Sequence, residues 1–236
     1  MPPRGRPIEK GWWKKGLGEM LGAFALVTVG AGSVLAANAA MGLTPQPVLI
    51  LLYAALAHGL VIAVFGTALG PISGGQISPA VTVGLWVTRR QKADLSAAII
   101  LFQLLGSILG GLVLLSLYPA KPLNLATPAV ASISPTQGAL LELLMTFFLV
   151  FVVFATAIDP RGAAKTLGAI PIGLTVGIDW FLGGGFTGAA MSPGRWIGPA
   201  LASGFFDNWW VYWVGPLLGG AMAALVYENV FLVKKK

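Results

Sequence analysis

The sequence predicts an all-α membrane protein: a bundle of six transmembrane helices with two re-entrant half-helices, arranged as an inverted internal repeat. The first observation is composition, because 10% of the 236 residues are charged and 56% are hydrophobic, whereas soluble domains usually carry about 25% charged residues. The second is that the apolar residues form long blocks, each able to cross a hydrocarbon core of ~30 Å. The third is a pair of shorter apolar stretches that both begin with Ser-Pro.

Six apolar blocks have the length of a membrane span, which is about 20 residues. Loops rich in proline, glycine or charge separate them, and the sequence Asp159-Pro160-Arg161-Gly162 divides the fourth block from the fifth. The first block is too long and too rich in glycine for the hydrophobic region of a signal peptide, so we interpret it as a retained span. The predicted spans are about 17–40, 48–69, 94–118, 137–158, 167–183 and 209–231.

Two apolar stretches, about 78–88 and 192–203, are too short to span and are predicted to be half-helices. Each starts with a serine, which is a favoured N-cap, followed by a proline, which is favoured at the first helical position. A helix of ~10 residues is ~15 Å long, about half the thickness of a bilayer. We therefore expect both segments to enter the membrane and stop near its middle.

The lysines and arginines are distributed as the positive-inside rule requires of a chain with six spans. Thirteen of the fifteen precede the first or third span, separate the fourth from the fifth, or follow the sixth. These places lie on one side of the membrane, so both termini are predicted to be cytoplasmic. The net charge of +7 is thus explained by topology, and we expect no nucleic-acid partner. The thirteen are Arg4, Arg6, Lys10, Lys14, Lys15, Arg89, Arg90, Lys92, Arg161, Lys165, Lys234, Lys235 and Lys236.

The two halves of the chain repeat one another. Gly59 stands 19 residues before Ser78, and Gly173 stands 19 residues before Ser192. Each half holds three spans, an odd number, so the second half enters the membrane inverted, a plan known from transport proteins. The two half-helices then enter from opposite sides and meet at their N-termini. We expect one channel domain over 1–236, with repeats at about 17–118 and 137–231.

The composition also excludes several kinds of chemistry. The chain has no cysteine and one histidine, so we expect no disulfide, no metal site and no cofactor. No cluster of histidine, aspartate and glutamate forms a catalytic pattern, so the sequence predicts that the protein is not an enzyme.

The half-helices and their flanks carry a family resemblance. The stretches 72–82 and 187–200 resemble the two signatures of the aquaporin and glycerol-facilitator family, the major intrinsic proteins, in which each half-helix starts with Asn-Pro-Ala. Here serine replaces both asparagines, and glycine ends the second triplet. Serine keeps the N-cap role but is smaller, so we expect a central constriction wider than is usual in the family. It would be formed by Ser78, Pro79, Ala80, Ser192, Pro193 and Gly194.

The same resemblance implies a selectivity filter. In the family, filter residues lie 20 positions before the first triplet, 12 and three positions before the second, and directly after the second, where an arginine stands. An arginine at membrane depth usually faces a polar path, because its insertion costs about 2.5–3.5 kcal/mol. We expect the tryptophan of the set to supply a flat apolar wall and the histidine to supply the opposing polar edge. The implied filter is His58, Trp180, Ala189 and Arg195.

Three further positions favour a water-type member over a glycerol facilitator. Glycerol facilitators usually carry aspartate, a basic residue and Pro-Leu where this chain has Trp196, Ala200 and Tyr212-Trp213. The resemblance therefore implies a passive channel for water that excludes protons and ions, assembled as a homotetramer in the cell membrane. A channel for small neutral solutes such as glycerol, hydrogen peroxide or ammonia is the alternative, and an ion-coupled secondary transporter is a remoter one.

Glu19, Glu142 and Asp179 are acidic residues within the predicted spans. Glu19 and Glu142 occupy matching places near the starts of the first and fourth spans, where paired carboxylates suit acid–base chemistry or ion coupling. The resemblance instead implies a structural role, because the matching glutamates of the family accept hydrogen bonds from the backbone of the re-entrant loops. For Asp179 the sequence allows pairing with Arg195 or a place in the outer vestibule.

Overall fold

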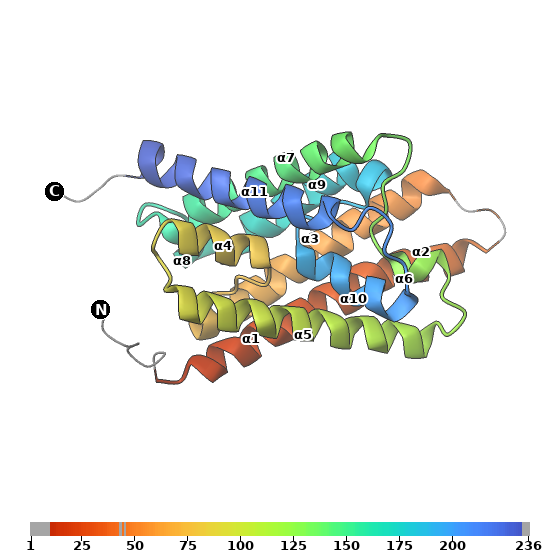
Figure 1. The fold of residues 1–236 in the computed structure, drawn as a ribbon, viewed down its shortest axis with the longest axis horizontal. Coiled ribbons are helices and arrows are strands. Elements are labelled where there is room, and N and C mark those ends of the chain that lie inside the picture. The colour runs from red at the N-terminus through yellow and green to blue at the C-terminus, as the bar shows by residue number, and fades with distance from the viewer. Residues whose placement is uncertain (1–9, 43, 45, 233–236) are drawn as a thin grey trace.

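The computed structural model describes residues 10–42, 44 and 46–232, and this part of the chain forms helices and connecting segments without a β-strand. Figure 1 shows the long helices side by side along the long axis of one bundle. Short π-helical segments, labelled η, continue three of them. The elements are α1 (Trp12–Ala25), η1 (Leu26–Ala31), α2 (Gly32–Met41), α3 (Pro47–Ser73), α4 (Pro79–Val87), α5 (Ala93–Leu117), α6 (Leu123–Ala126), α7 (Pro135–Val153), η2 (Phe154–Ile158), α8 (Ala164–Leu167), α9 (Ile170–Thr187), α10 (Pro193–Ser203), α11 (Val211–Val226) and η3 (Tyr227–Phe231).

Within the described residues, five continuous helices are long and apolar enough to cross a membrane: Trp12–Met41, Pro47–Ser73, Ala93–Leu117, Pro135–Ile158 and Val211–Phe231. The sixth long helix is α9, which has 18 residues and packs against α3 and α7 inside the same bundle. The predicted fold class, an all-α membrane bundle with two additional short helices, is confirmed.

The limits predicted for the fifth span were wrong by several residues. We expected about 167–183, but α9 begins at Ile170, continues to Thr187 and ends at Gly188 with a left-handed φ of 76°. Glycines inside α9 permit close packing against neighbouring helices, because a Cβ on Gly184 would lie 2.5 Å from Cδ1 of Leu51 on α3. A glycine run therefore marks a close helix contact here and not a helix end.

The two halves of the chain meet where α3 crosses α9. The glycines that stand at matching places in the sequence repeat, Gly59 and Gly173, face one another at this crossing. A Cβ on Gly59 would lie 2.7 Å from the carbonyl oxygen of Gly173, which is closer than van der Waals contact allows. The absence of side chains lets the backbones of the two helices touch, as small residues commonly do in membrane bundles.

The half-helices α4 and α10 begin near the middle of the bundle and run toward opposite ends of it (Figure 1). Their serines cap them as the Ser-Pro pairs predict, because Ser78 Oγ accepts a hydrogen bond from Ala80 N at 3.2 Å and Ser192 Oγ accepts one from Gly194 N at 3.1 Å. The two starts are in contact: a Cβ on Gly194 would lie 3.6 Å from Cδ of Pro79.

Hydrogen bonds from arginine side chains join two loops to η3. Arg90 donates hydrogen bonds from Nε and Nη2 to the carboxylate of Glu228 at 2.6 and 3.1 Å. Arg161 donates from Nη2 to the carbonyl oxygen of Phe231 at 2.9 Å, and its guanidinium holds the pKa of Asp159 well below the usual range. Both loops therefore lie at one end of the bundle. Arg4, Arg6, Lys234, Lys235 and Lys236, and the side chain of Lys165, lie outside the described residues.

Candidate functional site

A cavity of about 80 Å³ lies inside the bundle. It extends from Ala157 and Ile158 in η2, past Ser78 and Ser192 at the half-helix starts, to Arg195. Among the described residues that line it, Arg195 is the only charged one, and most of the others are apolar, including Ile62, Val81, Leu149, Val153, Ile172 and Val176. The cavity thus joins the predicted constriction to part of the predicted filter.

Arg195 is buried, with 2% of its surface exposed, in the first turn of α10. Its Nε donates a hydrogen bond to His58 Nε2 at 2.9 Å, and its Nη1 and Nη2 each donate to the carbonyl oxygen of Ala126 at 3.2 Å. Within the described chain, no carboxylate is in ion-pair contact with this guanidinium. Its positive charge therefore lies beside the cavity without a bonded carboxylate among the described residues, and the Glu142 carboxylate attracts it only at longer range.

The bonds of His58 determine its protonation. An arginine only donates hydrogen bonds, so His58 Nε2 must accept from Arg195, and the ring proton lies on Nδ1, which is 2.8 Å from the carbonyl oxygen of Ala54. The space for the ring comes from η1, because a Cβ on Gly30 would lie 2.6 Å from His58 Nε2. His58 and Arg195 therefore form one bonded polar pair beside the cavity.

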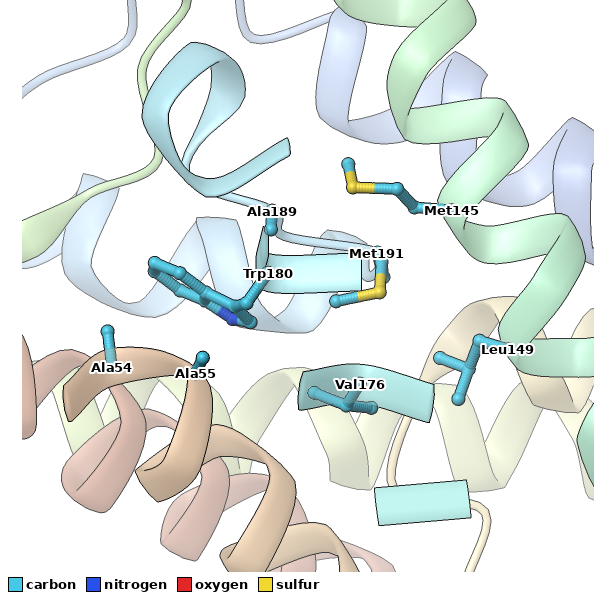
Figure 2. Packing of buried hydrophobic residues seen from close by; sticks show 8 residues of the cluster. All are labelled: Ala54, Ala55, Met145, Leu149, Val176, Trp180, Ala189 and Met191. Atoms are coloured by element: carbon cyan, nitrogen blue, oxygen red, sulfur yellow. The ribbon is translucent and has the colours of Figure 1, made fainter. Parts of the chain in front are cut away.

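Trp180 and Ala189 complete the predicted set of four. The Trp180 ring packs on His58 with centroids 4.4 Å apart and planes inclined by 37°. Figure 2 shows Trp180 between the α3 residues Ala54 and Ala55 and the loop residue Ala189. The Trp180 Nε1 donor is buried and has no hydrogen-bond partner within the described residues. The structure thus brings the four residues together: His58, Ala189 and Arg195 line the cavity, and Trp180 packs against His58 without lining it.

The residues of the predicted central constriction lie at the meeting point of α4 and α10. Both serines line the cavity, and each hydroxyl oxygen accepts only its cap hydrogen bond within the described chain. At the third position of the second triplet, a Cβ on Gly194 would lie 3.0 Å from Ser107 Oγ. That serine hydroxyl, which donates to the carbonyl oxygen of Gln103 at 2.9 Å, fills the space that an alanine side chain would need.

The two glutamates hold the two loops that precede the half-helices, in the same manner in each half of the chain. Glu19 accepts hydrogen bonds from Gln76 N at 2.9 Å and Ile77 N at 2.5 Å. Glu142 accepts from Ala190 N at 2.9 Å and Met191 N at 2.7 Å. Ser73 and Thr187, the last residues of α3 and α9, also donate to them from their side chains, at 2.6 and 2.7 Å. Both carboxylates are fully buried and neither lines the cavity.

Asp179 occupies neither of the places that the sequence allowed. It is 1% exposed, which rules out the vestibule, and it forms no ion pair with Arg195 in the described chain. Its Oδ2 is buried and has no hydrogen-bond donor among the described residues.

Sequence reasoning missed three groups that touch the site. The carbonyl oxygen of Ala126 bonds to the arginine, Ser107 packs against Gly194, and Gln103 Nε2 donates to Glu19 at 2.9 Å. A backbone carbonyl leaves no signal in a sequence. Gln103 did leave a signal in the sequence, because an amide side chain in the middle of an apolar span needs a buried hydrogen-bond partner.

These features define the class of protein. Two half-helices that enter a membrane bundle from opposite ends and meet at a cavity, with an arginine beside it, form a transmembrane channel. The chain belongs to the major intrinsic protein family, whose model matches residues 8–227. Members of this family are channels and not enzymes, so the protein is an aquaporin-type channel and an integral membrane protein with several spans.

Individual proteins agree with this assignment. Aquaporin TIP4-4 of Zea mays is 42% identical over 218 residues, which cover 92% of this chain and 86% of the maize protein. Probable aquaporin TIP4-1 of Oryza sativa subsp. japonica is 39% identical over 235 residues, covering 98% and 92%. The X-ray structure of the aquaglyceroporin from Plasmodium falciparum superposes with a TM-score of 0.77 at 25% identity, covering 93% of this chain and 97% of that one. These names include both kinds of channel, so they do not decide the solute.

Proposed function

We propose that the protein is a passive channel for water, with a selectivity filter formed by His58, Trp180, Ala189 and Arg195. The observation that carries this proposal is the buried Arg195 guanidinium beside the cavity, which forms no ion pair with a carboxylate of the described residues. Its remaining N–H groups can donate to the oxygen of a water molecule, and its charge repels cations. The half-helix starts add about half a positive charge each, and aquaporin-type pores are known to exclude protons and cations by such charges.

The cluster behind the filter favours water over glycerol. The three positions that separate the two types in the family lie together, because Trp196, Ala200 and Tyr212 belong to one buried apolar cluster. Trp196 stacks on Tyr212 with centroids 5.9 Å apart and planes inclined by 10°. An aspartate in place of Trp196 and a basic residue in place of Ala200 would be buried among apolar side chains. The cluster therefore suits the apolar residues of this chain and not the charged residues of glycerol facilitators.

A second candidate function is passage of small neutral solutes such as glycerol, hydrogen peroxide or ammonia. The observation in its favour is the centre of the pore, where serines replace the family's asparagines in Ser78-Pro79-Ala80 and Ser192-Pro193-Gly194. Smaller side chains leave more room than asparagine would. Under this proposal Glu19 and Glu142 have a structural role, since each holds the backbone of one re-entrant loop.

The proposed orientation places both termini in the cytoplasm. Lys15, Arg90 and Lys92 line one hollow at a single end of the bundle, and the positive-inside rule assigns this end to the cytoplasm. The channel is proposed to act as a homotetramer in the cell membrane. In support, α3 and α9 expose apolar side chains that suit lipid or neighbouring subunits, including Leu52, Leu56, Leu60, Leu174, Ile178 and Phe181.

Replacing both central serines by asparagine should reduce glycerol flux more than water flux. Asparagine caps a helix as well as serine does, so the fold should be preserved while the centre narrows at Ser78 and Ser192. We expect the glycerol-to-water permeability ratio to fall by about tenfold, which is the smallest effect typical of a change of one methylene in a pocket. Stopped-flow light scattering on proteoliposomes measures both fluxes. A rise in glycerol flux would contradict the role of the serines as space-makers.

Transport should be passive, which separates the channel from an ion-coupled transporter. A coupling site needs a group that binds and releases the ion within the pathway, and Arg195 is the only charged residue among the described residues that line the cavity. A pH or sodium gradient imposed on proteoliposomes should therefore not drive labelled glycerol uphill. Accumulation of glycerol against its own gradient would identify a transporter instead.

A further inference from the structure

The loop between α5 and α7 contains an unusual turn. The four residues of α6, Leu123–Ala126, have φ values of 50°, 50°, 55° and 53°, and none of them is glycine. This left-handed conformation is unfavourable for L-residues, because each Cβ approaches the following carbonyl oxygen. Four such residues in succession persist only where the surrounding contacts impose the conformation.

Contacts on both sides of the turn impose it. Leu125 is completely buried in a cluster with Leu35, Leu114 and Ala202, which belong to α2, α5 and α10. After the turn, Thr127 Oγ1 donates to the carbonyl oxygen of Asn124 at 2.5 Å and lies 3.2 Å from Ser203 Oγ. Before it, Lys121 Nζ donates to the carbonyl oxygen of Ser203 at 3.2 Å. The turn is therefore fastened to the far end of the half-helix that carries Arg195.

The turn sets the direction of one carbonyl group, that of Ala126. The oxygen of Ala126 accepts both Nη1 and Nη2 of Arg195 at 3.2 Å, while Nε donates to His58. These two contacts, on different edges of the guanidinium, fix its plane. Without the Ala126 carbonyl, the guanidinium would keep one anchor and could rotate about its bond to His58.

We infer that Leu125 is a positioning residue of the selectivity filter. Its buried side chain holds the left-handed turn, the turn aims the carbonyl of Ala126, and that carbonyl fixes Arg195 against the pore. Leu125 does not line the cavity, so its effect on the solute is indirect. This inference rests on the proposed function, in which Arg195 belongs to the filter.

The test replaces Leu125 by alanine and compares it with Leu123→Ala. Leu123 belongs to the same turn but is 52% exposed, so its loss removes no buried anchor. In proteoliposomes, Leu125→Ala should raise the glycerol-to-water permeability ratio by about tenfold, the effect of losing one hydrogen bond to a charged group. Leu123→Ala should leave the ratio unchanged, and Leu125→Met, which can still fill the cluster, should restore it. A merely structural role would lower both permeabilities together.

Thr127→Val keeps the side-chain shape but removes the hydroxyl that fastens the turn, so it should raise the ratio in the same direction. If Leu125→Ala does not yield folded protein, Thr127→Val alone decides the inference. Suppose that Leu125→Ala and Thr127→Val leave the glycerol-to-water permeability ratio unchanged while Trp180→Ala raises it. That result overturns the inference about Leu125 and supports the proposed filter. An unchanged ratio in Trp180→Ala as well overturns the filter itself, and the inference with it.

Discussion

Replacing Trp180 by alanine should open the channel to glycerol while water flux persists. The Trp180 ring is the only large apolar side chain among the four proposed filter residues, and it packs 4.4 Å from His58. Its removal leaves Arg195 bonded to His58 and Ala126, so the polar side of the filter is preserved. One methylene in a pocket changes discrimination by about 10–200-fold, so loss of the indole should raise the glycerol-to-water ratio by about tenfold or more.

The control for this variant is Trp209→Ala, which removes the same ring from a position that is 56% exposed. Both variants are reconstituted at equal protein density, and stopped-flow shrinkage is followed first with an impermeant osmolyte and then with glycerol. If Trp180→Ala left the glycerol-to-water permeability ratio unchanged, selectivity would have to lie outside the proposed filter, at Ser78 and Ser192.

Replacing Glu142 by leucine should destroy the channel. Three donors, Thr187 Oγ1, Ala190 N and Met191 N, lose their acceptor in the protein interior. Each buried donor without a partner costs about 1–3 kcal/mol, so the loop that positions Ala189 and the start of α10 should lose its conformation. We expect water permeability close to that of protein-free vesicles, together with a lower melting temperature in detergent.

Glu142→Gln provides the graded comparison, because the amide keeps one acceptor oxygen and should cause a smaller loss. Glu19→Leu should behave like Glu142→Leu, since Glu19 holds the matching loop through Gln76 N and Ile77 N. Normal permeability and stability in Glu142→Leu would show that the loop holds its shape without the carboxylate.

Most of the fold follows from the sequence because a bilayer restricts the choices. The lengths of the apolar blocks and the two Ser-Pro pairs predict the spans and the half-helices, and Ser78 and Ser192 cap α4 and α10 as expected. The limits of the fifth span, predicted at about 167–183, differ by three and four residues from those of α9, Ile170–Thr187, and the glycines at its end serve helix packing. Local sequence does not distinguish a glycine that ends a helix from one that lets a neighbouring helix approach closely.

The residues of the candidate site follow from the family resemblance, but their mutual bonds do not. Spacing places His58 and Arg195 in one filter, whereas their direct hydrogen bond depends on the crossing of helices far apart in the chain. The left-handed turn at Leu123–Ala126 contains no glycine, so the sequence carries no residue typical of such a turn there. Tertiary contacts of Leu125 impose that turn, and such contacts are invisible to local propensity.

Under the proposed function, water crosses the bilayer through this chain without protons. The most direct test is osmotic shrinkage of proteoliposomes, measured beside vesicle-internal pH under an imposed proton gradient. We predict shrinkage much faster than in protein-free vesicles, while the internal pH decays no faster than in those vesicles. Shrinkage at the rate of protein-free vesicles, or rapid collapse of the pH gradient, would contradict a water channel guarded by Arg195 and the two half-helix starts.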